Sequence, residues 1–179
     1  MRQDGVFYSF AKERHAPLLD FQLKGMTLEP NQLAIDHFKD WVPEIIYEDS
    51  DLVAVNKPAG LLSVPGKHAV RNVYDTILAM YPNATGPMLL HRLDMATSGV
   101  LIFAKTKFAH QQLQNAFAHG QIQKRYVALL EKCPEETYGE INLPLCLNPL
   151  ERPRQMVSRA YGKAAVTQYE VLGQEGEYT

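Results

Sequence analysis

The sequence predicts an α+β fold with a mixed, mostly antiparallel sheet and flanking helices. Short β-rich runs outnumber the helical stretches along the 179 residues. A turn-like segment, and no helix, separates the first two of these runs, which is typical of a hairpin. Strands and helices show no regular alternation, so a parallel α/β sheet is disfavoured. A chain of this length buries roughly two thirds of its unfolded surface and needs no disulfide or metal to hold a core.

The predicted hairpin opens the main domain. Ile45–Tyr47 and Leu52–Asn56 are β-rich, and the turn-like residues 48–51 lie between them. Lys57-Pro58-Ala59-Gly60 ends the second strand, because proline cannot donate to a ladder and glycine permits a tight bend. We therefore expect an N-terminal extension over residues 1–43 and a domain over residues 44–179.

Two helices follow. The first is expected over Asn72–Tyr81, with Asn72 as its N-cap and Pro82 after its end. The second is expected over Thr106–His119, with Gly120 at the C′ position. Four residues of the second helix share one side at helical spacing and predict a core face: Phe108, Leu113, Ala116 and Phe117.

Further strands are expected around and after the helices. Met88–Leu90 and Val100–Ala104 predict strands on either side of a polar loop. Tyr126–Leu130 and Ala164–Leu172 predict two more, and Pro144–Pro153 between them is an excursion punctuated by proline and asparagine.

Charge is unevenly distributed. The net charge is −2, but residues 1–51 hold ten acids and five bases, whereas residues 52–163 hold seven acids and thirteen bases. A local basic field attracts a polyanion whatever the charge of the whole chain. An unevenly charged but merely solvated surface explains the same numbers equally well.

Several classes of site and location are disfavoured. The longest apolar runs, such as Val100–Ala104, are too short to span a bilayer, and Met1–Phe10 lacks the apolar core of a signal peptide. Cys133 and Cys146 do not make a disulfide framework, and the six histidines lack metal-ligand spacing. We expect a cytoplasmic protein without membrane, metal or cofactor.

The polar loop His91–Gly99 is the most informative segment. It places Asp94 two residues from Arg92, between two apolar strands. Rigidly held loops commonly carry catalytic residues. A neighbouring cation favours a deprotonated carboxylate, which can act as a nucleophile. A turn capped by Asp94, with Arg92 in a surface ion pair, is the alternative.

This loop resembles the H-R-L-D-x-x-T-S-G motif of RluA-type RNA pseudouridine synthases. The resemblance is not confined to one motif. Residues 55–66 are similar to the family's N-K-P-x-G-L segment, and residues 124–128 resemble its K-x-Y-x-A strand. A P-L…R-P stretch and residues 162–171 continue the match, which covers about Ile45 to Leu172 and is closest to the RluA branch.

The resemblance implies isomerisation of specific uridines to pseudouridine in structured RNA, without a cofactor. It implies Asp94 as nucleophile, Tyr126 as the residue that stacks on the flipped base and assists proton transfer, and Arg92 as a phosphate contact. An ordinary half-buried strand tyrosine is the alternative for Tyr126. Substrates would be a tRNA anticodon stem-loop, large-subunit ribosomal RNA, or both, and no obligate protein partner is expected.

The remaining site residues are assigned in two groups. Basic residues predicted to contact RNA, each also explicable as a solvated side chain, are Lys105, Lys107, Arg152, Arg154, Arg159 and Lys163. Residues predicted to shape the motifs are His91, Leu93, Thr97, Ser98, Gly99, Lys57, Pro58 and Gly60.

The family's R-x-H-Q-L-R segment and later strands do not occur in this sequence, so we expect a partial catalytic domain, incomplete at its C-terminus. A catalytically inactive RNA-binding fragment is therefore an alternative function. A glycoside hydrolase is a third, weaker one, because that chemistry needs two carboxylates and Asp94 has no acidic partner in a motif.

Overall fold

The computed structural model describes residues 38–66, 71–131, 133–151, 154–176 and 178–179. They fall into two compact units, which divide between Ala116 and Phe117. The predicted extension over residues 1–43 lies almost entirely outside the described residues, so its boundary stays a prediction.

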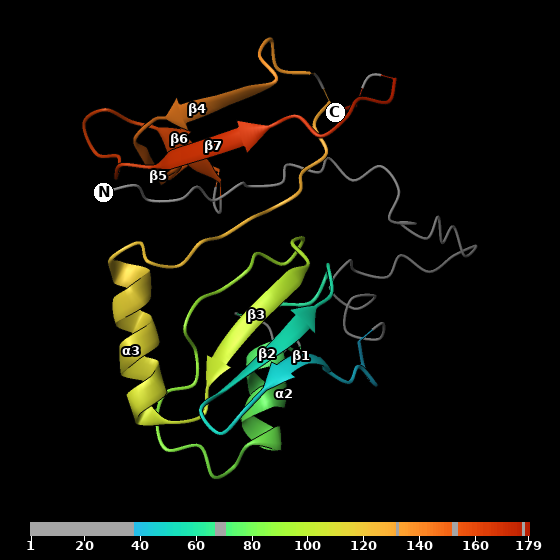
Figure 1. Cartoon of the computed structure of the whole chain (residues 1–179), viewed down its shortest axis with the longest axis vertical. Helices are drawn as coiled ribbons and strands as arrows, with labels where there is room; N and C mark the ends of the chain where they lie inside the picture. Colours follow the sequence, from blue (N-terminus) through green and yellow to red (C-terminus); the bar gives the residue numbers. More distant parts are fainter. Residues whose placement is uncertain (1–37, 67–70, 132, 152–153, 177) are drawn as a thin grey trace. The chain divides into compact units, whose positions relative to one another are not determined.

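The first unit is built on a three-stranded antiparallel sheet in the order β1-β2-β3 (Figure 1). The strands are β1 (Glu44–Glu48), β2 (Leu52–Lys57) and β3 (Gly99–Ala104). Asp49 closes the β1–β2 turn, because its Oδ1 accepts the N–H groups of Asp51 and Leu52, each at 2.8 Å. The predicted hairpin is confirmed.

The core of this unit lies on one face of β2 and β3. Val53 pairs with Phe103 and Val55 with Leu101, and all four side chains are fully buried. Alternate residues of a strand share a face. Lys57 is therefore the next residue on the core side of β2, and its side chain is also 0% exposed.

Helix α2 (Val73–Met80) confirms the first predicted helix. Asn72 caps it by accepting the Asp75 N–H at 2.9 Å. Val73 and Ile77 are fully buried, and the ring of Tyr74 lies 6.5 Å from that of Phe103 on β3. The helix therefore packs against the sheet.

Helix α3 (Lys107–Ala118) confirms the second predicted helix, with Gly120 after it at a φ of 64°. Its predicted core face is wrong at Phe108, which is 69% exposed, whereas Ala109 is buried. The cause is the orientation of the helix: His110 and Gln114 turn toward the 89–90 backbone, where His110 Nε2 lies 3.2 Å from the Leu89 carbonyl oxygen. Phe108 consequently faces away.

The second unit holds two small antiparallel sheets. Strand β4 (Tyr138–Asn142) pairs with β7 (Val166–Glu170), and β5 (Leu145–Leu147) pairs with β6 (Gln155–Val157). Strand β7 confirms the core of the strand predicted over 164–172. Strands β4, β5 and β6 were not expected; β5 lies within the proline-punctuated segment 144–153, and β6 follows it. None of the described residues from 117 to 179 is fully buried.

Two predicted strands are wrong. Tyr126–Leu130 forms no strand, and Leu130 pairs its backbone with Thr179 at 2.8 and 3.0 Å. Met88–Leu90 is reduced to a single bridge between Leu89 and Phe103. The fold class itself is confirmed, since every paired strand above is antiparallel and the helices flank the first sheet.

Candidate active site

The loop that carries Asp94 runs from His91 to the start of β3 and has no regular secondary structure. Asp94 is exposed, whereas the neighbouring Leu93 is only 8% exposed. The Thr97 N–H donates to the Asp94 carbonyl at 3.1 Å and closes a turn over residues 94–97. The carboxylate thus stands on a tight turn and faces solvent.

Ser63 fixes the residue before Asp94. Its hydroxyl donates to the Leu93 carbonyl at 2.5 Å, and its Oγ accepts the Leu93 N–H at 3.1 Å. Ser63 is 4% exposed. Both backbone polar groups of Leu93 are therefore satisfied away from water by one side chain.

The residue after Asp94 is fixed by the bend that follows β2. The Met95 carbonyl accepts the Gly60 N–H at 2.7 Å and the Lys57 ammonium at 3.1 Å. Gly60 has a φ of 89°, and a Cβ there would lie 3.3 Å from Phe38 Cε2. Glycine meets both requirements, a left-handed backbone and a close approach.

The Lys57 ammonium also donates to the Pro58 carbonyl at 2.9 Å and to the Leu61 carbonyl at 2.7 Å. Burial lowers the pKa of Lys57 to about 8, and the charge of Asp94 partly opposes that shift. The structural role of Lys57 and Pro58 stays a prediction.

The other motif residues support the ends of the loop. His91 Nε2 accepts the Ile102 N–H at 3.2 Å, which assigns the ring proton to Nδ1. Gly99 begins β3 opposite Lys57 at a φ of 120°. Thr97 is half-buried and Ser98 is exposed.

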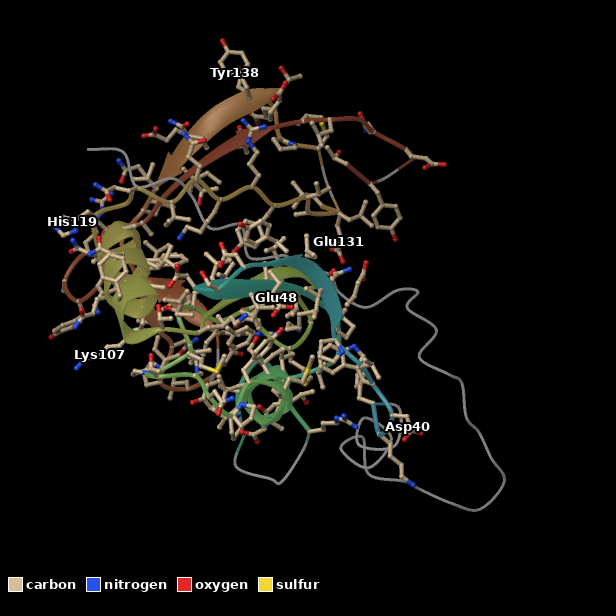
Figure 2. All side chains as sticks on the ribbon, turned by 60° about the horizontal axis from the view of Figure 1, so that its bottom comes forward. Asp40, Glu48, Lys107, His119, Glu131 and Tyr138 are labelled. Atoms are coloured by element: carbon tan, nitrogen blue, oxygen red, sulfur yellow. The ribbon has the colours of Figure 1, made fainter. Side chains whose placement is uncertain are left out.

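Two predicted basic contacts of this unit remain exposed. Arg92 is exposed, and within the described residues no ion pair joins it to Asp94. The phosphate contact predicted for Arg92 stays a prediction. Lys107 is exposed at the start of α3, where Figure 2 labels it at the helix end. Both side chains are available to a polyanion.

Lys105 differs from them because its ammonium is already engaged. It forms an ion pair with Glu48 at 2.9 Å, donates to the Asp49 carbonyl at 2.6 Å and lies 4.8 Å from the Tyr81 ring centroid. These contacts favour a structural role at the hairpin, and its RNA contact stays a prediction.

The remaining predicted residues belong to the second unit. Arg159 and Lys163 are exposed, and Arg154 pairs with Glu151 at 3.5 Å with both side chains more than half exposed. Tyr126 is half-buried. Arg152 lies outside the described residues. Because these residues and Asp94 are in different units, the roles of this group stay predictions.

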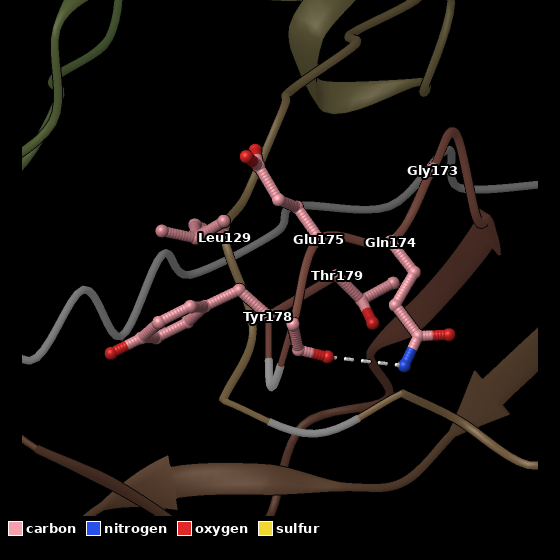
Figure 3. A pocket seen from close by; sticks show the side chains of 7 residues that line it. Leu129, Gly173, Gln174, Glu175, Tyr178 and Thr179 are labelled. Atoms are coloured by element: carbon pink, nitrogen blue, oxygen red, sulfur yellow. Dashed lines mark hydrogen bonds between the residues drawn. The ribbon is translucent and has the colours of Figure 1, made fainter.

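A pocket of about 730 Å³ lies beside the last residues of the second unit (Figure 3). Leu129 and five residues of the last segment, together with the terminal Thr179, surround it, and Gln174 donates to the Gly176 carbonyl at 3.5 Å. None of the predicted site residues lines it.

Across the described parts of the chain, no cluster of histidine, cysteine, aspartate or glutamate could hold a metal ion. Nor does a described helix have the length and apolarity to cross a membrane.

Residues 51–179 match the RNA pseudouridylate synthase family. The chain belongs to this family. Dual-specificity RNA pseudouridine synthases RluA are similar to it: 43% identity over 132 residues for the Haemophilus influenzae protein and 42% over 130 for that of Escherichia coli K12. Each alignment covers 72% of this chain and 58% of the relative. The chain thus spans less than two thirds of the length of these curated relatives.

Solved structures of the RNA pseudouridylate synthase family share the fold. Human RNA pseudouridylate synthase domain containing 4 matches with a TM-score of 0.60 and 27% identity, over 81% of this chain and 58% of that one. Human RNA pseudouridylate synthase domain containing 1 matches with a TM-score of 0.55 over 71% and 51%. At 24% identity, the second match concerns the fold alone.

Sequence reasoning missed the part played by Ser63. The residue stands inside the motif over 55–66, but nothing in a serine beside apolar residues indicates that it bonds a segment thirty positions away. It also missed that Lys57 reaches the carbonyl next to Asp94.

Proposed function

We propose that this protein isomerises uridine to pseudouridine in RNA, with Asp94 as the nucleophile. One observation carries the proposal: the backbone on both sides of Asp94 is pinned by hydrogen bonds, while its side chain stays open to solvent. A reactive group held in this way meets a bound substrate without further ordering. Family membership supplies the reaction class.

The reaction breaks the N1–C1′ glycosidic bond and joins C1′ to C5 of the same base, so nothing is transferred between molecules. The Asp94 carboxylate would form a covalent adduct with either C1′ of the sugar or C6 of the base. After rotation of the base and formation of the C5–C1′ bond, the bond to the Asp94 carboxylate breaks and frees the enzyme, the C5 proton leaves to solvent and N1 gains a proton. The isomerisation involves no net oxidation or reduction, so the enzyme needs no redox partner.

The target nucleotide has to leave its stack to reach Asp94. Extrusion of a base costs a few kcal/mol. Stacking on an aromatic ring recovers roughly 1–3 kcal/mol per base. We assign that ring to Tyr126, whose hydroxyl would also assist proton transfer.

Phosphate contacts would come from exposed cations. We assign Arg92 to the phosphates nearest the flipped nucleotide, since it shares the loop with Asp94 and is exposed. Lys107, Arg154, Arg159 and Lys163 are exposed as well. Arg152 and Lys105 stay as further predicted contacts.

The proposed substrates are a tRNA anticodon stem-loop and a segment of large-subunit ribosomal RNA. The name of the similar proteins, dual-specificity RNA pseudouridine synthase, supports two kinds of RNA. Proteins that bind structured RNA recognise the shape of a loop and its splayed bases more than they read a base sequence with particular side chains. We further propose that the protein works in the cytoplasm and needs no protein partner.

The test is to incubate the purified protein with a tRNA stem-loop, a ribosomal RNA fragment and an unrelated uridine-containing strand. Chemical mapping and mass spectrometry then locate pseudouridine. We expect product at defined uridines of the first two RNAs and none in the third. Binding of the structured RNAs without product would support the RNA-binding alternative, and equal modification of all three would contradict the substrate assignment.

A further inference from the structure

Tyr161 is the most exposed of the tyrosine and phenylalanine side chains that the structure describes, at 85%. It stands in the turn between β6 and β7, in the second unit. A single exposed apolar side chain is common on protein surfaces. The meaning of this one therefore depends on how its backbone is held and on which charges surround it.

The turn that carries Tyr161 wraps around the start of β5. Leu145 of β5 pairs with Val157 of β6 on one side and with Lys163 on the other. Both backbone bonds between Leu145 and Lys163 are formed, at 2.8 and 2.9 Å. Residues 158–162 thus connect the two neighbours of one strand, and both ends of the turn are fixed by that strand.

The turn is also held from within. The Ser158 N–H donates to the Pro144 carbonyl at 2.9 Å, and the Gly162 N–H donates to the Ser158 carbonyl at 2.8 Å. The Tyr161 N–H donates to Ser158 Oγ at 3.2 Å. A Cβ at Gly162 would collide with the Ser158 carbonyl oxygen and lie 2.6 Å from the Pro144 carbonyl carbon, so only glycine allows this close packing. The Tyr161 ring therefore projects from a well-ordered backbone.

The charges beside Tyr161 are all positive. Residues 152–163 contain four arginines and lysines and no acid. Arg159 lies two residues before the ring and Lys163 two residues after it, and both side chains are exposed. The turn thus presents one flat apolar ring between two cations.

This combination fits a single-stranded nucleic acid. Proteins bind single strands with cations that follow the phosphates and with aromatic rings on which the bases stack. An acidic peptide would satisfy the cations but would offer the ring no planar partner of this kind. A fully paired duplex also fits poorly, because its bases are already stacked on one another.

We propose that Tyr161 stacks on an unpaired base of the RNA substrate, while Arg159 and Lys163 contact the phosphates on either side of that nucleotide. The inference rests on the proposed function, because that function makes RNA the ligand. It goes further by assigning a second stacking residue. Tyr126 is assigned to the flipped target base, so Tyr161 binds another unpaired base and makes affinity depend on a single-stranded loop.

The test compares the affinity of wild type and Tyr161→Ala for a tRNA anticodon stem-loop and for a fully paired RNA duplex of the same length. We expect Tyr161→Ala to weaken stem-loop binding about fivefold or more, the loss that corresponds to the lower end of base stacking on an aromatic ring. Tyr161→Phe keeps the ring and should bind within about twofold of wild type. Duplex binding should hardly change in either variant.

Tyr138→Ala is the matched control. Tyr138 is a second tyrosine of the same unit, 75% exposed and projecting from β4 (Figure 2). It lies two residues after Glu136 and two before Glu140, and both carboxylates are exposed. The acids repel phosphate where the cations of the other turn attract it, so Tyr138→Ala should bind RNA like wild type. Equal affinities of Tyr161→Ala and Tyr138→Ala for the stem-loop would overturn the proposal.

The dependence of binding on salt separates stacking from charge. Tyr161→Ala removes no phosphate contact, so its slope of log K against log salt should equal that of wild type, whereas Arg159→Gln should reduce the slope by roughly 1. Tyr161→Leu keeps an apolar side chain without the ring and should lose stem-loop affinity as Tyr161→Ala does. Equal losses for stem-loop and duplex, or wild-type affinity in Tyr161→Leu, would contradict stacking.

These binding experiments are independent of catalysis. If Tyr161→Ala loses stem-loop affinity while the wild type forms no pseudouridine, the stacking site stands and the proposed function fails. If the wild type forms pseudouridine and Tyr161→Ala binds the stem-loop as tightly, the proposed function stands and the stacking site falls.

Discussion

At the scale of single residues, the candidate site consists of one exposed carboxylate and the buried groups that hold its backbone. Ser63 fixes Leu93, and Lys57 with Gly60 fixes Met95. The polar composition of His91–Gly99, between two apolar runs, predicted that Asp94 would lie on a loop. The hydrogen bonds could not be predicted, because their partners are backbone groups that any residue carries and only the fold brings together.

Ser63→Ala should destabilise the first unit. It leaves the Leu93 N–H and carbonyl without their partner, and an unsatisfied buried polar group costs about 1–3 kcal/mol. Chemical denaturation would measure the loss, with Ser50→Ala as the control, because Ser50 is exposed and makes one long bond of 3.3 Å to Asp51. Equal stability of the two variants would show that the Ser63 bonds contribute little.

Stability should also depend on pH through Lys57. Its pKa falls from 10.5 to about 8 on folding because burial disfavours the charge. Between these values the unfolded chain binds more protons than the folded one, so the free energy of unfolding rises with pH across that window. Denaturation of wild type and Lys57→Met at several alkaline pH values isolates this contribution. Parallel pH profiles of the two proteins would contradict it.

At the scale of elements, local signals predicted the segments that have their partners nearby. The β1–β2 turn closes on Asp49, and Asn72 caps α2, both within a few residues. Tyr126–Leu130 has a strand-like composition yet forms no strand, and Leu130 pairs its backbone with Thr179 at the far end of the chain. Phe108 similarly obeys the helical period, but contacts of His110 and Gln114 orient α3 differently. Composition does not specify partners far along the chain.

The bend after β2 should be intolerant of a side chain at Gly60. Gly60→Ala would place a Cβ 3.3 Å from Phe38 Cε2 on a backbone with φ of 89°. We expect a loss of about 1–3 kcal/mol from backbone strain, with added crowding. Gly99→Ala is the matched control, since it has a φ of 120° and no neighbour within 4 Å. A smaller loss in Gly60→Ala than in Gly99→Ala would contradict the role of the Phe38 contact.

At the scale of the whole molecule, the family and the fold class were predictable from ordered motifs, whereas the placement of charge was only partly so. The sequence predicts that Lys105 contacts RNA, but in the structure its ammonium pairs with Glu48 of the hairpin. Arg154 and Arg159 remain exposed in the second unit. Long-range attraction of RNA depends on such exposed charges rather than on the net charge of −2.

Arg154→Glu combined with Arg159→Glu should therefore weaken RNA binding and flatten its dependence on salt. Each lost phosphate contact reduces the slope of log K against log salt by roughly 1. Binding titrations at several salt concentrations measure the slope. Lys39→Glu serves as control, as it reverses an exposed charge in the acidic N-terminal part of the sequence. An unchanged slope in the double variant would show that these two arginines are merely solvated and do not contact RNA.

The central claim, that Asp94 is the nucleophile of a pseudouridine synthase, is tested most directly by comparing wild type with Asp94→Asn. The amide keeps the shape of the side chain but cannot act as a carboxylate nucleophile. Pseudouridine is quantified by mass spectrometry after incubation with a tRNA stem-loop, and RNA affinity is measured in parallel. We predict product from the wild type, none from Asp94→Asn, and similar affinity for both. Comparable product from both proteins, or none from the wild type, would contradict the account.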